Sequence, residues 1–108
     1  MHVRLLAILL ALPICPAAAH DWYTGKVDPV TRIGCCGDMD CRAIEDGDVR
    51  ELADGSYVYL PRYWRVPAAR VQSSPDFRFH ICESALFNEN ASTLEWRWVC
   101  FFAPPRMM

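Results

Sequence analysis

From Cys41 onward, the chain consists of short runs of residues that favour β-strands, separated by turn-forming residues. The runs at 48–52 (DVREL) and 56–61 (SYVYLP) flank Asp54-Gly55. This pair predicts a β-hairpin, because both residues tolerate a positive φ. The run at 62–67 (RYWRVP) ends at a proline, which cannot donate a hydrogen bond within a sheet. We therefore expect a third strand there, which completes a small meander.

A second hairpin is predicted closer to the C-terminus, and its first strand is the run at 77–84 (FRFHICES). Because side chains alternate along a strand, Phe79 and Ile81 should lie on one face of it, and His80 and Cys82 on the other.

The partner strand of this hairpin is the run at 94–102 (LEWRWVCFF). The same alternation predicts that four of its side chains share one face: Trp96, Trp98, Cys100 and Phe102. We expect a turn at 72–76, a loop at 88–92, and room for one short helical turn within 84–92.

Residues 20–40 follow neither a helical nor a strand period, and they contain three glycines and a proline. We expect an irregular segment there. Its predicted apolar anchors are Trp22, Tyr23, Val30 and Ile33. The whole pattern predicts a mainly β fold, with a small α+β arrangement as the alternative, in a single domain of short antiparallel strands.

The chain begins with the pattern of a secretory signal peptide: Arg4, an apolar run at 5–12, and alanines at 17–19. Cleavage after Ala19 is favoured. The apolar run is shorter than the ~20 residues that a membrane-spanning helix needs. We therefore expect a signal peptide at 1–19 and one exported domain at 20–108, periplasmic or secreted, with no membrane span after cleavage.

Removal of the signal peptide leaves ten Lys and Arg against thirteen Asp and Glu, which gives a net charge of −3 with neutral histidines. A mildly acidic chain without a basic cluster lacks the electrostatic features of a nucleic-acid-binding protein. We therefore exclude nucleic acid as a partner.

Five cysteines remain in the exported chain: Cys35, Cys36, Cys41, Cys82 and Cys100. Thiols normally pair in an oxidising compartment, and a domain of this size is only marginally stable by burial alone. We expect two disulfides, of which at least one joins the loop at 35–41 to Cys82 or Cys100. The odd number leaves one thiol free or bonded to another molecule, and fifteen arrangements of two bridges stay open.

Two other uses of the cysteine-rich loop GCCGDMDC at 34–41 are less favoured. A zinc site is weakly indicated, because the loop lacks a Cys-x-x-Cys knuckle and no second knuckle follows. Thiol redox chemistry is disfavoured, because Asp38 and Asp40 would raise the pKa of a neighbouring thiol.

A copper site is the alternative function. Cleavage after Ala19 makes His20 the first residue, and its α-amine and imidazole then form a chelate. His80 is the other histidine of the exported chain, and its imidazole could complete a T-shaped set of nitrogen donors.

Two pairs of aromatic residues occur at strand spacing: Trp96 with Trp98, and Tyr57 with Tyr59. We expect them to belong to the core rather than to form a stacking platform for sugars or peptides. No serine lies in a Gly-x-Ser-x-Gly turn, and no pair of carboxylates has a separation that the sequence specifies. We therefore expect no catalytic residues.

Four motifs resemble those of a group of small exported proteins of proteobacteria whose function is uncharacterised: HDWYTG after the signal peptide, CCGxxDC at 35–41, PDFRFHIC at 75–82 and CFFAPP at 100–105. The resemblance implies the periplasm as the destination, and it carries over no catalytic residue. The expected function is a non-catalytic periplasmic binding or accessory module, stabilised by disulfides and without a cofactor. Its partner would be a protein or a small molecule.

Overall fold

The computed structural model describes residues 22–35 and 40–106, and it confirms a mainly β architecture. The strands are β1 (Asp40–Ile44), β2 (Val49–Glu51), β3 (Tyr57–Tyr59), β4 (Trp64–Val66), β5 (Val71–Ser73), β6 (Phe79–Asn88) and β7 (Thr93–Ala103). Two 3₁₀ turns, η2 (Asp46–Asp48) and η3 (Ala68–Arg70), precede β2 and β5. In the described part of the chain, no helix is long and apolar enough to cross a membrane.

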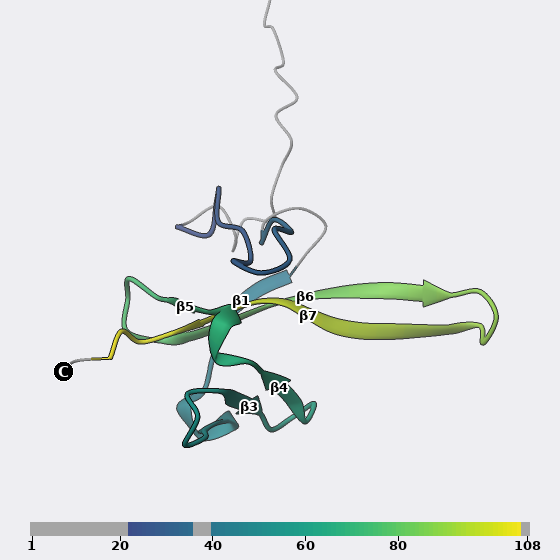
Figure 1. Ribbon diagram of the computed structural model, residues 1–108. Coiled ribbons are helices and arrows are strands. Elements are labelled where there is room, and N and C mark those ends of the chain that lie inside the picture. The colour runs from purple at the N-terminus through teal and green to yellow at the C-terminus, as the bar shows by residue number, and fades with distance from the viewer. Residues whose placement is uncertain (1–21, 36–39, 107–108) are drawn as a thin grey trace, which may run out of the picture.

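The strands form two sheets (Figure 1). The larger sheet has the order β1-β6-β7-β5, in which β5 runs parallel to β7 and the other neighbours are antiparallel. The smaller sheet has the order β2-β3-β4 and is antiparallel throughout.

The smaller sheet is the predicted meander. Tyr57 of β3 pairs with Glu51 of β2 and with Val66 of β4. The turn between β2 and β3 contains Gly55, whose φ of 86° lies in the left-handed region that favours glycine. The turn predicted from the Asp-Gly pair is therefore present, and of its two residues only the glycine has a positive φ.

The larger sheet is covered on both faces (Figure 1). The N-terminal segment at 22–35 lies over one face, where a buried cluster contains Tyr23, Cys35, Cys41, Cys82, Val99, Cys100 and Phe102. The smaller sheet lies over the other face, where a second buried cluster contains Ile44, Tyr57, Tyr59, Val66, Ile81, Phe101 and Ala103. The molecule therefore has three layers with a core on each side of the central sheet.

Two strands of the larger sheet were not predicted. β1 follows the cysteine-rich loop directly, and β5 begins just before the expected turn at 72–76. Both are short strands at the edges of the sheet, and each forms because β6 or β7 offers it a ladder of backbone hydrogen bonds. Such pairing depends on residues far away in the sequence, so local patterns indicate it poorly.

The expected helical turn within 84–92 is wrong. β6 continues to Asn88, and β7 begins at Thr93. Residues 84–88 pair with 93–97 in an antiparallel register, so the second hairpin is longer than predicted.

The predicted common face of the last strand is also wrong for two residues, since Trp96 and Trp98 lie on the face opposite Cys100. Cys82 pairs with Cys100, but Glu83 pairs with Trp98, so β7 has one extra residue at this point. This β-bulge places both Val99 and Cys100 in the first cluster and moves Trp98 to the second. The alternation predicted for β6 is confirmed, since Cys82 lies in the first cluster and Ile81 in the second.

The N-terminal segment uses only part of its apolar side chains as anchors. Tyr23 is buried, and Trp22 packs against the same cluster. Val30 and Ile33, which were also predicted as anchors, are exposed.

Candidate functional site

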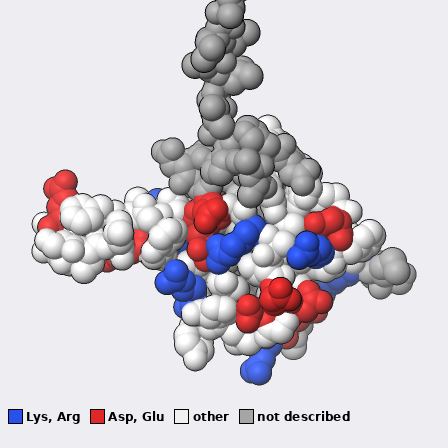
Figure 2. Space-filling view, turned by 180° about the vertical axis from the view of Figure 1, so that it is seen from behind, with Lys and Arg blue, Asp and Glu red and all other residues white. Residues whose placement is uncertain are grey.

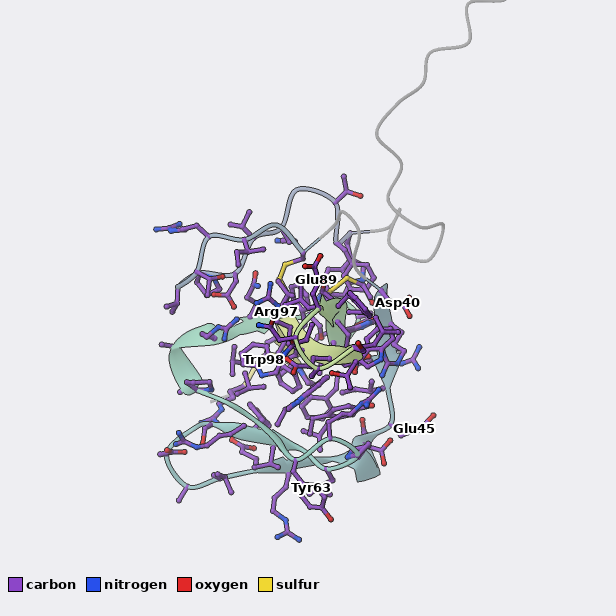
Figure 3. The ribbon with its side chains drawn as sticks, turned by 90° about the vertical axis from the view of Figure 1, so that its right-hand side faces the viewer. Asp40, Glu45, Tyr63, Glu89, Arg97 and Trp98 are labelled. Carbon is purple, nitrogen blue, oxygen red and sulfur yellow. A yellow bond between two sulfur atoms is a disulfide. The ribbon has the colours of Figure 1, made fainter. Side chains whose placement is uncertain are left out.

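Two disulfides join the cysteine-rich loop to the larger sheet (Figure 3). Cys35 is bonded to Cys100 of β7, and Cys41 of β1 to Cys82 of β6. All four sulfurs therefore serve as covalent links between segments that lie 65 and 41 residues apart in the sequence. Cys36, the fifth cysteine of the exported chain, lies outside the described residues.

The imidazole of His80 is buried between two hydrogen-bond partners. Its Nε2 lies 2.8 Å from both carboxylate oxygens of Asp76, and its Nδ1 is hydrogen bonded to the hydroxyl group of Tyr23. A carboxylate can only accept, so Nε2 carries the proton, and in the neutral ring Nδ1 accepts from Tyr23. Burial by itself raises the pKa of Asp76, but the hydrogen bonds from His80 and from the backbone N–H of Arg78 hold it below its ordinary value.

This arrangement bears on the predicted copper site. A copper ion needs a free lone pair on one ring nitrogen, and in His80 both nitrogens already have partners. Among residues 22–35 and 40–106, no three His, Cys, Asp or Glu side chains are grouped as a metal site requires. His20 lies outside these ranges, so the copper site stays a prediction.

A buried ion pair between Asp28 and Arg70 also attaches the N-terminal segment to the rest of the fold. The carboxylate of Asp28 is fully buried, accepts hydrogen bonds from the backbone N–H groups of Val30 and Thr31, and lies 2.8 Å from Nε of Arg70. Burial alone raises the pKa of Asp28, but these hydrogen bonds outweigh it, and the pKa is lowered. The guanidinium of Arg70 also donates to the carbonyl of Val99 and stacks 3.7 Å from the ring centre of Trp98.

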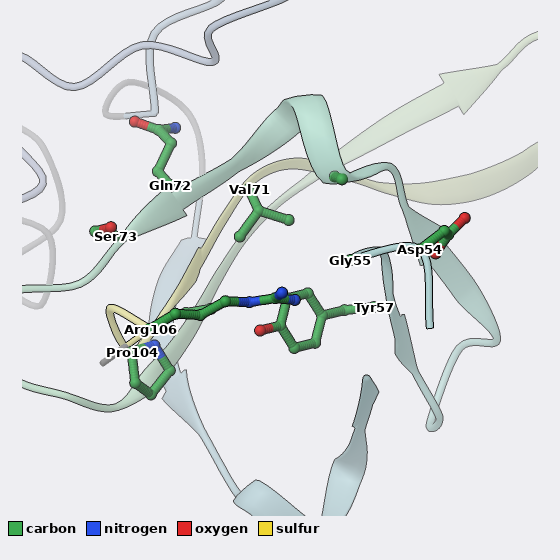
Figure 4. Close-up of a pocket in the computed structure, with 10 residues that line it drawn as sticks. Asp54, Gly55, Tyr57, Val71, Gln72, Ser73, Pro104 and Arg106 are labelled. Carbon is green, nitrogen blue, oxygen red and sulfur yellow. The ribbon is translucent and has the colours of Figure 1, made fainter. Parts of the chain in front are cut away.

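A pocket of about 430 Å³ lies between β3, β5 and the end of β7 (Figure 4). Its lining residues are Asp54, Gly55, Tyr57, Ala68, Val71, Gln72, Ser73, Ala103, Pro104 and Arg106. Both charged side chains of this lining already have partners, since Asp54 pairs with Arg65 and Arg106 with Glu51. The pocket therefore offers no unpaired charge with which to select a ligand.

The outer half of the β6–β7 hairpin carries several exposed apolar side chains. Residues 84–97, which we call the arm, extend beyond the rest of the larger sheet (Figure 1). Four apolar side chains of the arm are exposed by between 41 and 64%: Leu86, Phe87, Leu94 and Trp96. In Figure 2 the charged side chains gather on the body of the molecule, while the arm is largely free of them apart from a red patch at its tip.

The register places most of these side chains together. Ala85 lies opposite Trp96, and Phe87 opposite Leu94, so these two cross-strand pairs share one face of the arm. Leu86 lies on the other face, opposite Glu95. One face of the arm is therefore a continuous apolar strip that no described residue covers completely.

Both edges of the arm are also open. β1 pairs with β6 only as far as Glu83, and β5 pairs with β7 only from Phe101 onward. Along the arm, no other described strand continues the ladder on either side. A two-stranded ribbon with two open edges and an apolar face has the features of a surface to which another chain adds a strand.

This surface was not predicted from the sequence. Tyr57 and Tyr59 are buried as predicted, but Trp96 is exposed rather than part of the core. Residues 84–88 (SALFN) do not alternate between polar and apolar side chains, so the pattern carried no signal that the strand continues to Asn88. The exposure of Phe87 and Leu94 could not be read from the pattern, because an alternating strand looks the same whether or not something covers its apolar face.

Comparison with known proteins yields no relationship for this chain: no protein-family model, no curated protein and no solved structure matches it.

Proposed function

We propose that this protein is an exported, non-catalytic binding or accessory module that docks through its arm onto an extended segment of another polypeptide chain. The observation that carries the proposal is the apolar strip of Phe87, Leu94 and Trp96 on a ribbon with two open edges. An extended segment satisfies such a surface best, because its backbone completes the ladder while alternate side chains cover the strip.

The body of the molecule supports this proposal. Disulfides are typical of exported proteins. Here Cys35–Cys100 ties the N-terminal segment to the central sheet, and Cys41–Cys82 links β1 to β6 within that sheet. They hold the base of the arm rigidly: Cys82 and Cys100 lie opposite each other at the point where the arm leaves the sheet. A rigid base presents the strip at low entropic cost, which favours association.

Amide hydrogen exchange of residues 84–97 in the mature protein tests the proposal. We expect slow exchange along the arm when a partner is present, either at high protein concentration or after addition of the periplasmic proteins of the host cell. The double variant Phe87→Thr/Leu94→Thr should abolish this protection, because threonine keeps the strand but removes the apolar strip.

The control is Val30→Thr/Ile33→Thr, which removes two exposed apolar side chains from the N-terminal segment and should leave the protection unchanged. If the amides of the arm exchange at the same fast rate at every concentration and in every mixture, the arm is not a docking surface and the proposal is wrong.

A further inference from the structure

The open edge of β7 carries two opposite charges with one residue between them. Glu95 and Arg97 lie on the same face of the arm, and Trp96 lies on the other face. Figure 3 shows Arg97 and its neighbour Trp98 on opposite sides of the strand. Neither Glu95 nor Arg97 forms an ion pair with a described residue, and Glu95 only accepts a hydrogen bond of 3.2 Å from the side chain of Asn88.

This spacing is self-complementary. When two copies of one strand pair in an antiparallel manner about a two-fold axis at a given residue, the residue before it faces the residue after it in the other copy. With the axis at Trp96, Glu95 faces Arg97 of the second copy, and Arg97 faces Glu95 of the second copy. Two ion pairs form on one face, and the two Trp96 side chains meet on the other.

Neighbouring registers lack this complementarity. An axis at Glu95 places two carboxylates opposite each other, and an axis at Arg97 does the same with two guanidinium groups. Like charges directly opposite each other destabilise a sheet. The charges therefore select the register centred on Trp96.

The rest of the fold limits how far a second copy can pair along β7. The carbonyl of Val99 is already bound by Arg70, and β5 occupies the edge of β7 from Phe101 onward. Pairing is thereby confined to residues 94–98, and within that span Leu94 faces Trp98 of the second copy. The apolar strips of the two arms then join into one surface.

We propose that the occupant of the arm is a second copy of this chain, which pairs through β7 about a two-fold axis at Trp96. The inference rests on the proposed docking function and names its partner. Five paired residues on each side form a small interface, so the dimer is weak and forms at high micromolar concentration or above.

Charge reversal tests this register. Sedimentation velocity of the mature protein is measured over roughly 10 μM to 1 mM, the range in which an interface of this size associates. Glu95→Arg and Arg97→Glu should each raise the dissociation constant about tenfold, because each turns two attractive pairs into two repulsive ones. The double variant Glu95→Arg/Arg97→Glu should restore dimerisation, since the same pairs form with exchanged partners.

The matched control is Glu89→Arg, which makes the same change of charge in the loop outside the paired residues and should leave the dissociation constant unchanged. Circular dichroism verifies that all variants keep their fold. A dimer that the single reversals do not weaken, or that the double variant does not restore, overturns the register at Trp96.

Two outcomes separate this inference from the proposed function. If the protein stays monomeric throughout, while host periplasmic proteins still protect the arm from exchange, the second copy is wrong and the docking function stands. If neither association nor protection occurs, both fail.

Discussion

Asp28 shows how a single side chain can secure a segment that has no regular structure. Its carboxylate organises the turn at Val30 and Thr31 and also holds Arg70, which in turn reaches β7. We expect Asp28→Asn to lower the free energy of unfolding by about 2–4 kcal/mol, because the variant leaves a largely buried guanidinium without its counter-charge. Urea denaturation at neutral pH measures this loss, and a change below ~1 kcal/mol would contradict it.

The ionisation of Asp28 should also make the free energy of unfolding depend on pH. The pKa of Asp28 is lowered in the folded protein from its ordinary value of 3.8, so the unfolded chain binds the proton more tightly. The stability that this carboxylate contributes is therefore complete above pH 3.8 and is lost as the pH falls toward the lower folded value. Urea denaturation between pH 6 and pH 2 should show a shallower loss for Asp28→Asn than for the wild type. Asp76 titrates in the same direction, so part of the slope should remain.

The hydrogen bond between Tyr23 and His80 leads to another prediction about the effect of a single substitution on stability. Tyr23→Phe removes the hydroxyl group and leaves Nδ1 of the buried imidazole without that hydrogen bond. We expect a loss of about 1–2 kcal/mol in the free energy of unfolding. Tyr63→Phe is the control, since the Tyr63 side chain is 84% exposed and its variant should unfold like the wild type. Equal losses in the two variants would show that the buried contact contributes nothing specific.

Among the structural elements, the β6–β7 hairpin has two halves with different roles. The inner half is buried on both faces, while the outer half is the arm. We expect Phe87→Thr/Leu94→Thr to change the free energy of unfolding by no more than about 0.5 kcal/mol, because these side chains are already exposed in the folded protein. Thermal unfolding measures it at low protein concentration, where partners do not contribute. A large loss would mean that the strip is part of the core.

The bulge at Val99 separates these two halves, and it explains why the common face predicted for the last strand was wrong. Strand positions and the direction of pairing follow from alternation and from the turn between the strands, which are local features of the sequence. The extra residue in β7 is stabilised by contacts from other parts of the chain, including the bond from Arg70 to the Val99 carbonyl. Nothing in the sequence around Arg70 or Val99 indicates that this hydrogen bond forms.

Across the whole molecule, one disulfide links the N-terminal segment to the larger sheet, and the other links β1 to β6 within that sheet. The Cys35–Cys100 bridge predicts a specific result for limited proteolysis. A Glu-specific protease should cut the arm at Glu89 or Glu95 first, because both are exposed. The two fragments should remain joined on a denaturing gel without reductant and should separate after reduction, because Cys100 in the C-terminal fragment is bonded to Cys35.

The matching variant for this experiment is Cys35→Ala/Cys100→Ala. Its C-terminal fragment should be released without reductant, and mass spectrometry identifies it. Release of that fragment from the unreduced wild-type protein would show that the bridge is absent.

Local patterns in the chain were sufficient to predict a mainly β fold, the meander, the second hairpin and disulfides from the cysteine-rich loop. Alternation, turn-forming residues and the chemistry of thiols each act over a few residues or on composition alone, so one chain reveals them. Other features arise only when segments that lie tens of residues apart in the sequence come into contact. They are the pairing of Cys35 with Cys100, the edge strands β1 and β5, the position of Trp98 on the opposite face of β7, and the exposure of the arm. Such meetings depend on the combined packing of three layers, and no short stretch of sequence contains that information.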